Sequence, residues 1–104
     1  MTAFVSSLRA RPDTIVLGSG ITIRVEMPEV WDSVRIETPA TEPISEIKAA
    51  ALKALYPDDH SDADFVVKLN GYEILDESVP ISQTGAFDGS TLLVTFRRRR
   101  PVRS

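Results

Sequence analysis

The chain has 104 residues, a formal net charge of −3, 42% hydrophobic and 26% charged residues, and no cysteine. This length and balance are typical of one globular domain rather than of a disordered chain. Without cysteine there is no disulfide, no thiolate metal ligand and no thiol nucleophile, and no apolar run approaches the roughly 20 residues that cross a bilayer. We therefore expect a cytoplasmic protein.

The charges are distributed unevenly along the chain. Residues 21–96 carry fourteen Asp and Glu side chains against five Lys and Arg side chains. A basic run then follows, formed by Arg97, Arg98, Arg99, Arg100 and Arg103. An acidic body with a basic end indicates an interaction segment. The alternatives are that the run solubilises a frayed terminus or folds back on the acidic body.

We divide the chain into a flexible N-terminal arm at 1–20, one domain at 21–98 and a basic C-terminal tail at 99–104. The arm shows no clear period, contains Pro12 and ends in Gly18-Ser19-Gly20. This composition favours a mobile segment with, at most, an extended piece over residues 14–17.

A strand hairpin is predicted next. Residues 21–27 alternate apolar with polar side chains, as along a half-buried strand. Pro28 to Asp32 supply a turn, and residues 33–37 repeat the alternation, which predicts the returning strand.

The spacing over residues 43–56 predicts a helix. Thr41 is a candidate N-cap, and Pro43 suits a first helical turn because its missing N–H has no intrahelical partner to lose. Lys48 and Lys53 lie off the apolar face. That face is formed by Ile44, Ile47, Ala51, Leu52 and Leu55.

Residues 65–69 alternate as a third strand, and Asn70-Gly71 predicts a type I′ turn into a short strand at 72–75. An irregular crossing segment over residues 76–87 leads to a final strand at 91–96. The order β-β-α-β-β-β, a mixed sheet packed on one helix, is an α+β fold. The predicted core consists of Ile23, Val25, Val34, Ile36, Ile47, Leu55, Val67, Leu69, Leu92 and Val94.

Four segments, taken in this order, resemble ubiquitin across roughly residues 21–100. They are Ile21-Thr-Ile-Arg-Val, Ile44-Ser-Glu-Ile-Lys-Ala, Val67-Lys-Leu-Asn-Gly-Tyr-Glu-Ile-Leu-Asp and Ser90-Thr-Leu-Leu-Val-Thr-Phe-Arg-Arg. The resemblance implies a ubiquitin-like β-grasp fold.

The sequence departs from ubiquitin after the last strand. Ubiquitin and the sulfur-carrier β-grasp proteins end in Gly-Gly, whereas residues 99–104 read Arg-Arg-Pro-Val-Arg-Ser. In this respect, and in the glycine-bearing turn over 85–93, the chain resembles the YukD/EsaB-type proteins of bacterial type VII secretion. That resemblance implies a non-catalytic protein-interaction module. The alternatives are a protein modifier or sulfur carrier, and a small β-grasp subunit of a multicomponent enzyme.

The residues offer little chemistry. His60 is the only histidine and lies in the acidic loop 58–64, so we interpret it as a surface or structural residue. As a calcium loop, this segment lacks the required glycine, and Leu69 stands where a bidentate Glu is needed. We predict no enzymatic activity, no cofactor and no metal site.

Strand alternation predicts a binding surface on the open face of the sheet. If Phe65, Val67, Leu92 and Val94 point inward, their neighbours point outward. Trp31 in the hairpin turn either projects as an interface anchor or folds down to cap the core. The predicted protein-binding residues are Trp31, Val66, Lys68, Leu93, Thr95, Arg97, Arg98, Arg99 and Arg100.

The partner is expected to be a protein. The acidic body disfavours a long polyanion, so the Arg run favours protein over membrane and membrane over nucleic acid. We expect no small-molecule substrate, and contact with a membrane-associated complex fits the type VII resemblance. The oligomeric state is left open.

Overall fold

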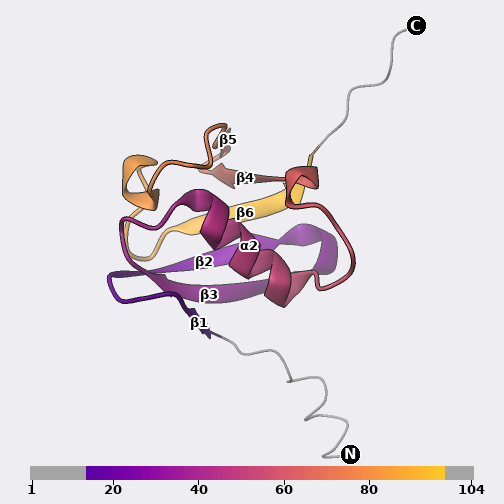
Figure 1. The fold of residues 1–104 in the computed structure, drawn as a ribbon, viewed down its shortest axis with the longest axis horizontal. Coiled ribbons are helices and arrows are strands. Elements are labelled where there is room, and N and C mark those ends of the chain that lie inside the picture. The colour runs from indigo at the N-terminus through magenta and orange to yellow at the C-terminus, as the bar shows by residue number, and fades with distance from the viewer. Residues whose placement is uncertain (1–13, 98–104) are drawn as a thin grey trace, which may run out of the picture.

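In the computed structural model, which describes residues 14–97, one α-helix lies across one face of a six-stranded mixed sheet (Figure 1). The strands are β1 (Thr14–Val16), β2 (Ile21–Met27), β3 (Asp32–Thr38), β4 (Phe65–Leu69), β5 (Tyr72–Glu73) and β6 (Thr91–Phe96). The helix is α2 (Ile44–Leu55), and three 3₁₀ turns are η1 (Pro28–Val30), η2 (Asp62–Asp64) and η3 (Ile81–Gln83). The predicted α+β order is thus confirmed.

The strands lie in the order β1-β3-β2-β6-β4-β5. The central pair, β2 and β6, is parallel, while the β2–β3, β4–β6 and β4–β5 pairs are antiparallel. The strand predicted at 72–75 is shorter than expected, because only Tyr72 and Glu73 pair with β4.

The sheet begins before the predicted domain start at residue 21. Residues 14–16 form β1, which pairs parallel with β3, and Leu17 donates its N–H to the Glu37 carbonyl oxygen at 2.7 Å. Ile15 packs against the core, which explains why a short apolar segment without a clear period still joins the sheet. Within the predicted arm, residues 1–13 lie outside the described residues, as does the tail 99–104.

The core lies between α2 and the inner face of the sheet. All ten predicted core residues are buried, and the largest fully buried side chains also include Phe65, Met27, Ile44, Leu52 and Ile81. The two-residue period of the strands and the helical period of α2 therefore predict the same interior. Between residues 14 and 97, no helix has the length and apolarity needed to cross a bilayer.

The start of α2 is capped differently from the prediction. The helix begins at Ile44, after an extended Pro43, and no side chain caps it, so the expected role for Thr41 is wrong. The crossing segment supplies the missing acceptors, because Ile44 and Ser45 donate their N–H groups to the carbonyls of Val79 and Glu77 at 3.0 and 2.8 Å. Backbone groups distant in sequence thus replace the local cap.

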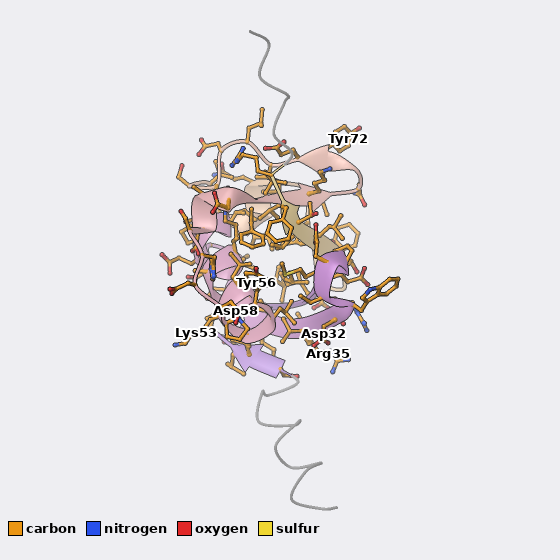
Figure 2. All side chains as sticks on the ribbon, turned by 90° about the vertical axis from the view of Figure 1, so that its right-hand side faces the viewer. Asp32, Arg35, Lys53, Tyr56, Asp58 and Tyr72 are labelled. Carbon is orange, nitrogen blue, oxygen red and sulfur yellow. The ribbon has the colours of Figure 1, made fainter. Side chains whose placement is uncertain are left out.

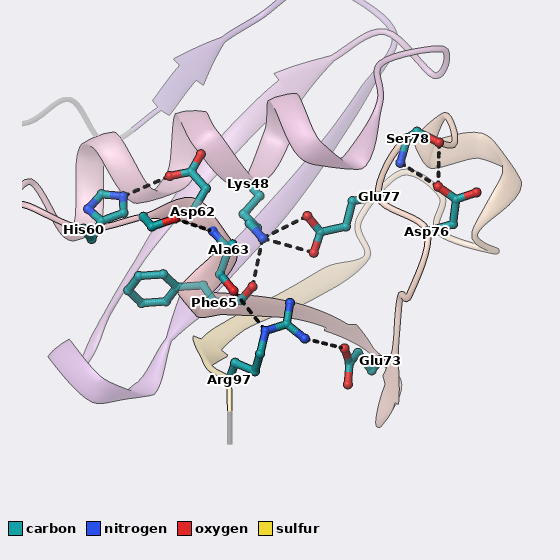
Figure 3. Close-up of polar contacts among 11 residues, drawn as sticks. Lys48, His60, Asp62, Ala63, Phe65, Glu73, Asp76, Glu77, Ser78 and Arg97 are labelled. Atoms are coloured by element: carbon teal, nitrogen blue, oxygen red, sulfur yellow. Dashed lines mark hydrogen bonds and ion pairs between the residues drawn. The ribbon is translucent and has the colours of Figure 1, made fainter. Parts of the chain in front are cut away.

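Lys48 is the clearest departure from the helical pattern. It was expected off the apolar face, yet it is only 3% exposed. Its Nζ donates to the Phe65 carbonyl oxygen at 2.8 Å and lies 2.9 Å from Glu77 Oε1 (Figure 3). A buried ammonium needs such partners, and Lys48 thereby ties α2 to the start of β4 and to the crossing segment.

Candidate protein-binding surface

The sheet face opposite α2, here called the outer face, carries four of the nine predicted binding residues: Val66, Lys68, Leu93 and Thr95. Cross-strand register sorts its side chains into rows that run across the sheet. The Arg row consists of Thr14, Arg35, Arg24 and Thr91. The neighbouring Leu93 row consists of Ser33, Glu26, Leu93, Lys68 and Glu73.

Trp31 lies at the tip of the β2–β3 hairpin. Its backbone N–H donates to the Pro28 carbonyl oxygen at 3.1 Å, and its backbone conformation is left-handed, with φ 55° and ψ 43°. A bulky residue rarely adopts this conformation, which costs roughly 1–2 kcal/mol because Cβ crowds the following carbonyl. The residue is 94% exposed. Of the two predicted alternatives, the structure therefore has the projecting one.

A hollow of about 380 Å³ adjoins the indole. Glu26 and Ser33, which line it, also belong to the Leu93 row, so the hollow opens onto the outer face. Polar groups and an exposed aromatic residue therefore line the same hollow. The complete lining is Glu26, Met27, Pro28, Trp31, Asp32 and Ser33.

Leu93 is the apolar centre of the outer face. It is half-buried on β6 and lies opposite Glu26 on β2 and Lys68 on β4. One aliphatic side chain is thus flanked by an acid and a base. The surface around Leu93 is therefore mixed in character.

The expectation that Val66 is exposed is wrong, because it is only 4% exposed. Val66 pairs with Thr95, whose hydroxyl donates to Glu29 of η1. The turn thus reaches over this end of the outer face. Alternation assigned Val66 to the correct face, but it contains no information on whether a neighbouring turn covers that face.

Glu29 holds this end of β6 through a second bond, from the Phe96 N–H at 3.1 Å. Partial burial acts to raise the pKa of Glu29, but the hydrogen bonds from Thr95 and Phe96 outweigh it and lower the pKa below its ordinary value. The carboxylate form is therefore the one that the fold favours.

Arg97 is integrated into the fold rather than free at its rim. Its N–H donates to the Asp64 carbonyl oxygen at 2.7 Å, and Nε donates to the Ala63 carbonyl oxygen at 2.9 Å. Its Nη1 also lies 3.7 Å from Glu73 Oε2 (Figure 3). Arg98, Arg99 and Arg100 lie outside the described residues, so their predicted role stays a prediction.

His60 is tied into its own loop. Nδ1 lies 2.7 Å from the Asp58 carbonyl oxygen, Nε2 lies 3.0 Å from Asp62 Oδ1, and the ring packs edge-on against Tyr56 and Phe65. This arrangement agrees with a structural histidine. In the described part of the chain, no group of three or more His, Asp or Glu side chains is placed to hold a metal ion.

The sequence matches no protein-family model and no curated protein, but solved structures match its fold. The ubiquitin-like domain of Arabidopsis thaliana protein At2g32350 aligns with 17% identity and a TM-score of 0.61, over 85% of this chain and 88% of that chain. The N-terminal ubiquitin-like domain in the 4931431F19Rik protein aligns with 24% identity and a TM-score of 0.60, over 81% of each chain.

At these identities the likeness concerns the fold. Both alignments span most of the partner domain, and the single helix on a mixed sheet with a parallel central pair accounts for them. The chain therefore has the ubiquitin-like β-grasp fold that its sequence segments implied.

Proposed function

We propose that the chain is a non-catalytic, protein-binding ubiquitin-like module whose partner covers the Trp31 hollow and Leu93. The observation that carries this proposal is the indole of Trp31, 94% exposed on a left-handed backbone. In the isolated chain this side chain gains almost nothing from burial, and its backbone conformation is unfavourable. Exposed outliers of this kind concentrate at working surfaces.

The gain on binding is large enough to matter. An aromatic side chain of this size buries about 150–250 Å² when covered, which at about 25 cal/mol per Å² is roughly 4–6 kcal/mol before association costs. Tryptophan is enriched among the few residues that dominate interface energetics. Leu93 and Lys68 then supply a small apolar contact and a charged margin beside this anchor.

The test uses matched variants of two exposed aromatic residues. The partner is captured from the native source with immobilised wild-type chain and with the variants Trp31→Ala, Leu93→Ala and Tyr72→Ala. Tyr72, 76% exposed on β5, is the control because it lies apart from the hollow. We expect capture to fall most with Trp31→Ala, less with Leu93→Ala, and to be retained with Tyr72→Ala. Equal capture by all four chains would overturn the proposal.

The resemblance to YukD/EsaB-type proteins narrows the proposed partner to a component of a bacterial secretion complex. What supports it is the glycine-bearing turn over 85–93 and the absence of a glycine pair from residues 97–104. Reciprocal capture, with secretion-complex components as bait, tests this narrower proposal. Incubation with an activating enzyme and ATP tests the alternative, since only a modifier or sulfur carrier forms an adenylate or thioester.

A further inference from the structure

The Arg row places two like charges directly opposite each other. Arg24 on β2 faces Arg35 on β3, and both side chains are exposed on the outer face. Like charges placed directly opposite each other on a sheet are destabilising relative to neutral residues. The fold tolerates this pair because both groups are exposed to water, and the pair remains available to a ligand.

Neither guanidinium is neutralised within the fold. Arg24 Nη1 donates to Ser33 Oγ at 3.5 Å, and between residues 14 and 97 neither Arg24 nor Arg35 forms an ion pair. The row continues with Thr14 beside Arg35 and Thr91 beside Arg24. Two hydroxyls thus flank two guanidinium groups, and the whole row consists of side chains that can donate hydrogen bonds.

The surface at this row is concave. A hollow of about 250 Å³ is lined by Arg24, Ser33, Val34 and Arg35. Guanidinium groups match the geometry of carboxylate and phosphate oxygens, to which they donate paired hydrogen bonds. The two guanidinium groups and the concave surface fit an oxyanion.

We propose that the Arg row binds one anionic side chain, a phosphorylated residue or a carboxylate, on an extended segment of the protein partner. This inference rests on the proposed function and names the chemistry of that partner. Figure 2 shows Arg35 and Asp32 on the same side of the molecule, away from Lys53. The oxyanion site and the Trp31 hollow therefore lie along one hairpin.

The carboxylates beside the row select the kind of anion. Glu26 follows Arg24 by two positions on β2, and Glu37 follows Arg35 by two on β3, so acids border the row on both sides. An extended anionic surface, such as a membrane or a nucleic acid, would be repelled by them. A single anionic side chain at the two guanidinium groups would approach fewer carboxylates and be repelled less.

The spacing along β2 predicts how far apart two contact residues lie in the partner segment. Arg24 precedes Pro28 of η1 by four positions, which at about 3.3 Å per residue is roughly 13 Å. A strand-like partner segment would therefore carry its anionic residue about four residues from the residue that contacts the hollow at Pro28.

The test is an amide NMR titration of the isotope-labelled full chain with sodium phosphate and with sodium acetate, against sodium chloride at equal ionic strength. We expect saturable shifts at Thr14, Arg24, Arg35 and Thr91. Arg35→Gln should weaken phosphate binding by about tenfold, as expected for the loss of a charged hydrogen-bonding pair. Lys53→Gln, which removes one equal charge from exposed α2 surface, should leave binding within about twofold. Tighter binding of phosphate than acetate assigns a phosphorylated residue, and equal binding assigns a carboxylate.

Three results would overturn the proposal. Amide shifts that do not saturate with phosphate would show general charge screening only. The same conclusion would follow if Arg35→Gln and Lys53→Gln reduced these shifts equally. Binding to phosphatidylserine vesicles that Arg35→Gln abolishes would assign the row to lipid instead of protein. Arg24→Gln provides a second variant if Arg35→Gln does not fold. Trp31→Ala should leave phosphate binding unchanged, so failure of the oxyanion site and failure of the proposed interface are distinguishable.

Discussion

The positive charge of Lys48 and those of the Arg24–Arg35 pair lie in opposite environments. Lys48 is buried, and the Phe65 carbonyl and the Glu77 carboxylate satisfy its ammonium group. The two arginines are exposed, face each other, and have no carboxylate partner within residues 14–97. Burial makes an unpaired charge very costly, whereas water screens an exposed one. A charge cluster left without partners on a surface is thus tolerated by the fold, and it remains available to a ligand.

The largest expected effect comes from breaking the buried side of this comparison. Lys48→Met should destabilise the fold by about 3 kcal/mol, because it leaves the Phe65 carbonyl without its donor and Glu77 without its counterion. Urea unfolding measures this loss. The double variant Lys48→Met with Glu77→Gln should recover part of it, since the isolated carboxylate is gone. A single variant as stable as wild type would show that Lys48 contributes nothing net.

Trp31 should respond in the opposite direction. Trp31→Gly should leave stability unchanged or raise it by up to about 1 kcal/mol, because glycine accepts a positive φ and the exposed indole contributes no core packing. Thermal unfolding of the isolated chain measures this. A clear drop in the melting temperature would mean that the indole packs on the hairpin in solution.

Arg35→Gln should stabilise the isolated chain slightly, by about 0.2–1 kcal/mol at low ionic strength, because it removes a like-charge pair. The gain should shrink as salt is added, since both groups are exposed. Chemical unfolding at two salt concentrations measures it. If Arg35→Gln destabilised the chain, the arginines would have to contribute packing or a pairing that outweighs their repulsion.

The smallest expected effect is a pH dependence at Glu29. Its pKa is lower in the folded chain than the ordinary value of 4.5, so its carboxylate stabilises the fold above that pH. That contribution is lost as the pH falls through the lowered, folded-state pKa. Glu29→Gln should therefore be slightly less stable than wild type at neutral pH, with the gap closing in acid. Urea unfolding across this pH range checks the sign; a gap that is constant with pH would contradict it.

Much of the fold was predictable because its periods are regular. The strands at residues 21–27, 65–69 and 91–96 match β2, β4 and β6, and the helix expected at 43–56 is α2 at Ile44–Leu55. Asn70 and Gly71 both have positive φ, as a type I′ turn requires. These signals are local, since side-chain alternation and turn conformation depend on adjacent residues.

The candidate site was predictable only in part. Trp31, Lys68, Leu93 and Thr95 could be assigned to the hairpin turn and the outer face from sequence, but the exposure of each depends on what lies over it. Glu29 reaches Thr95 and Phe96, which lie far along the chain, and Val66 is buried nearby. Side-chain periodicity along the sequence does not predict the contact of Glu29 with Thr95 and Phe96.

What the sequence determined by itself is therefore the helix and the strands from residue 21 onward, their inward faces and the ten core residues, because 2.0- and 3.6-residue periods express burial directly. Only the tertiary structure decided which residues contact one another across the fold. It joined Thr14–Val16 to β3, buried Lys48 beside Glu77, and placed Arg24 opposite Arg35. Each of these depends on strand order and register, which bring together residues whose separation along the chain carries no signal. The proposed oxyanion site is a product of that register.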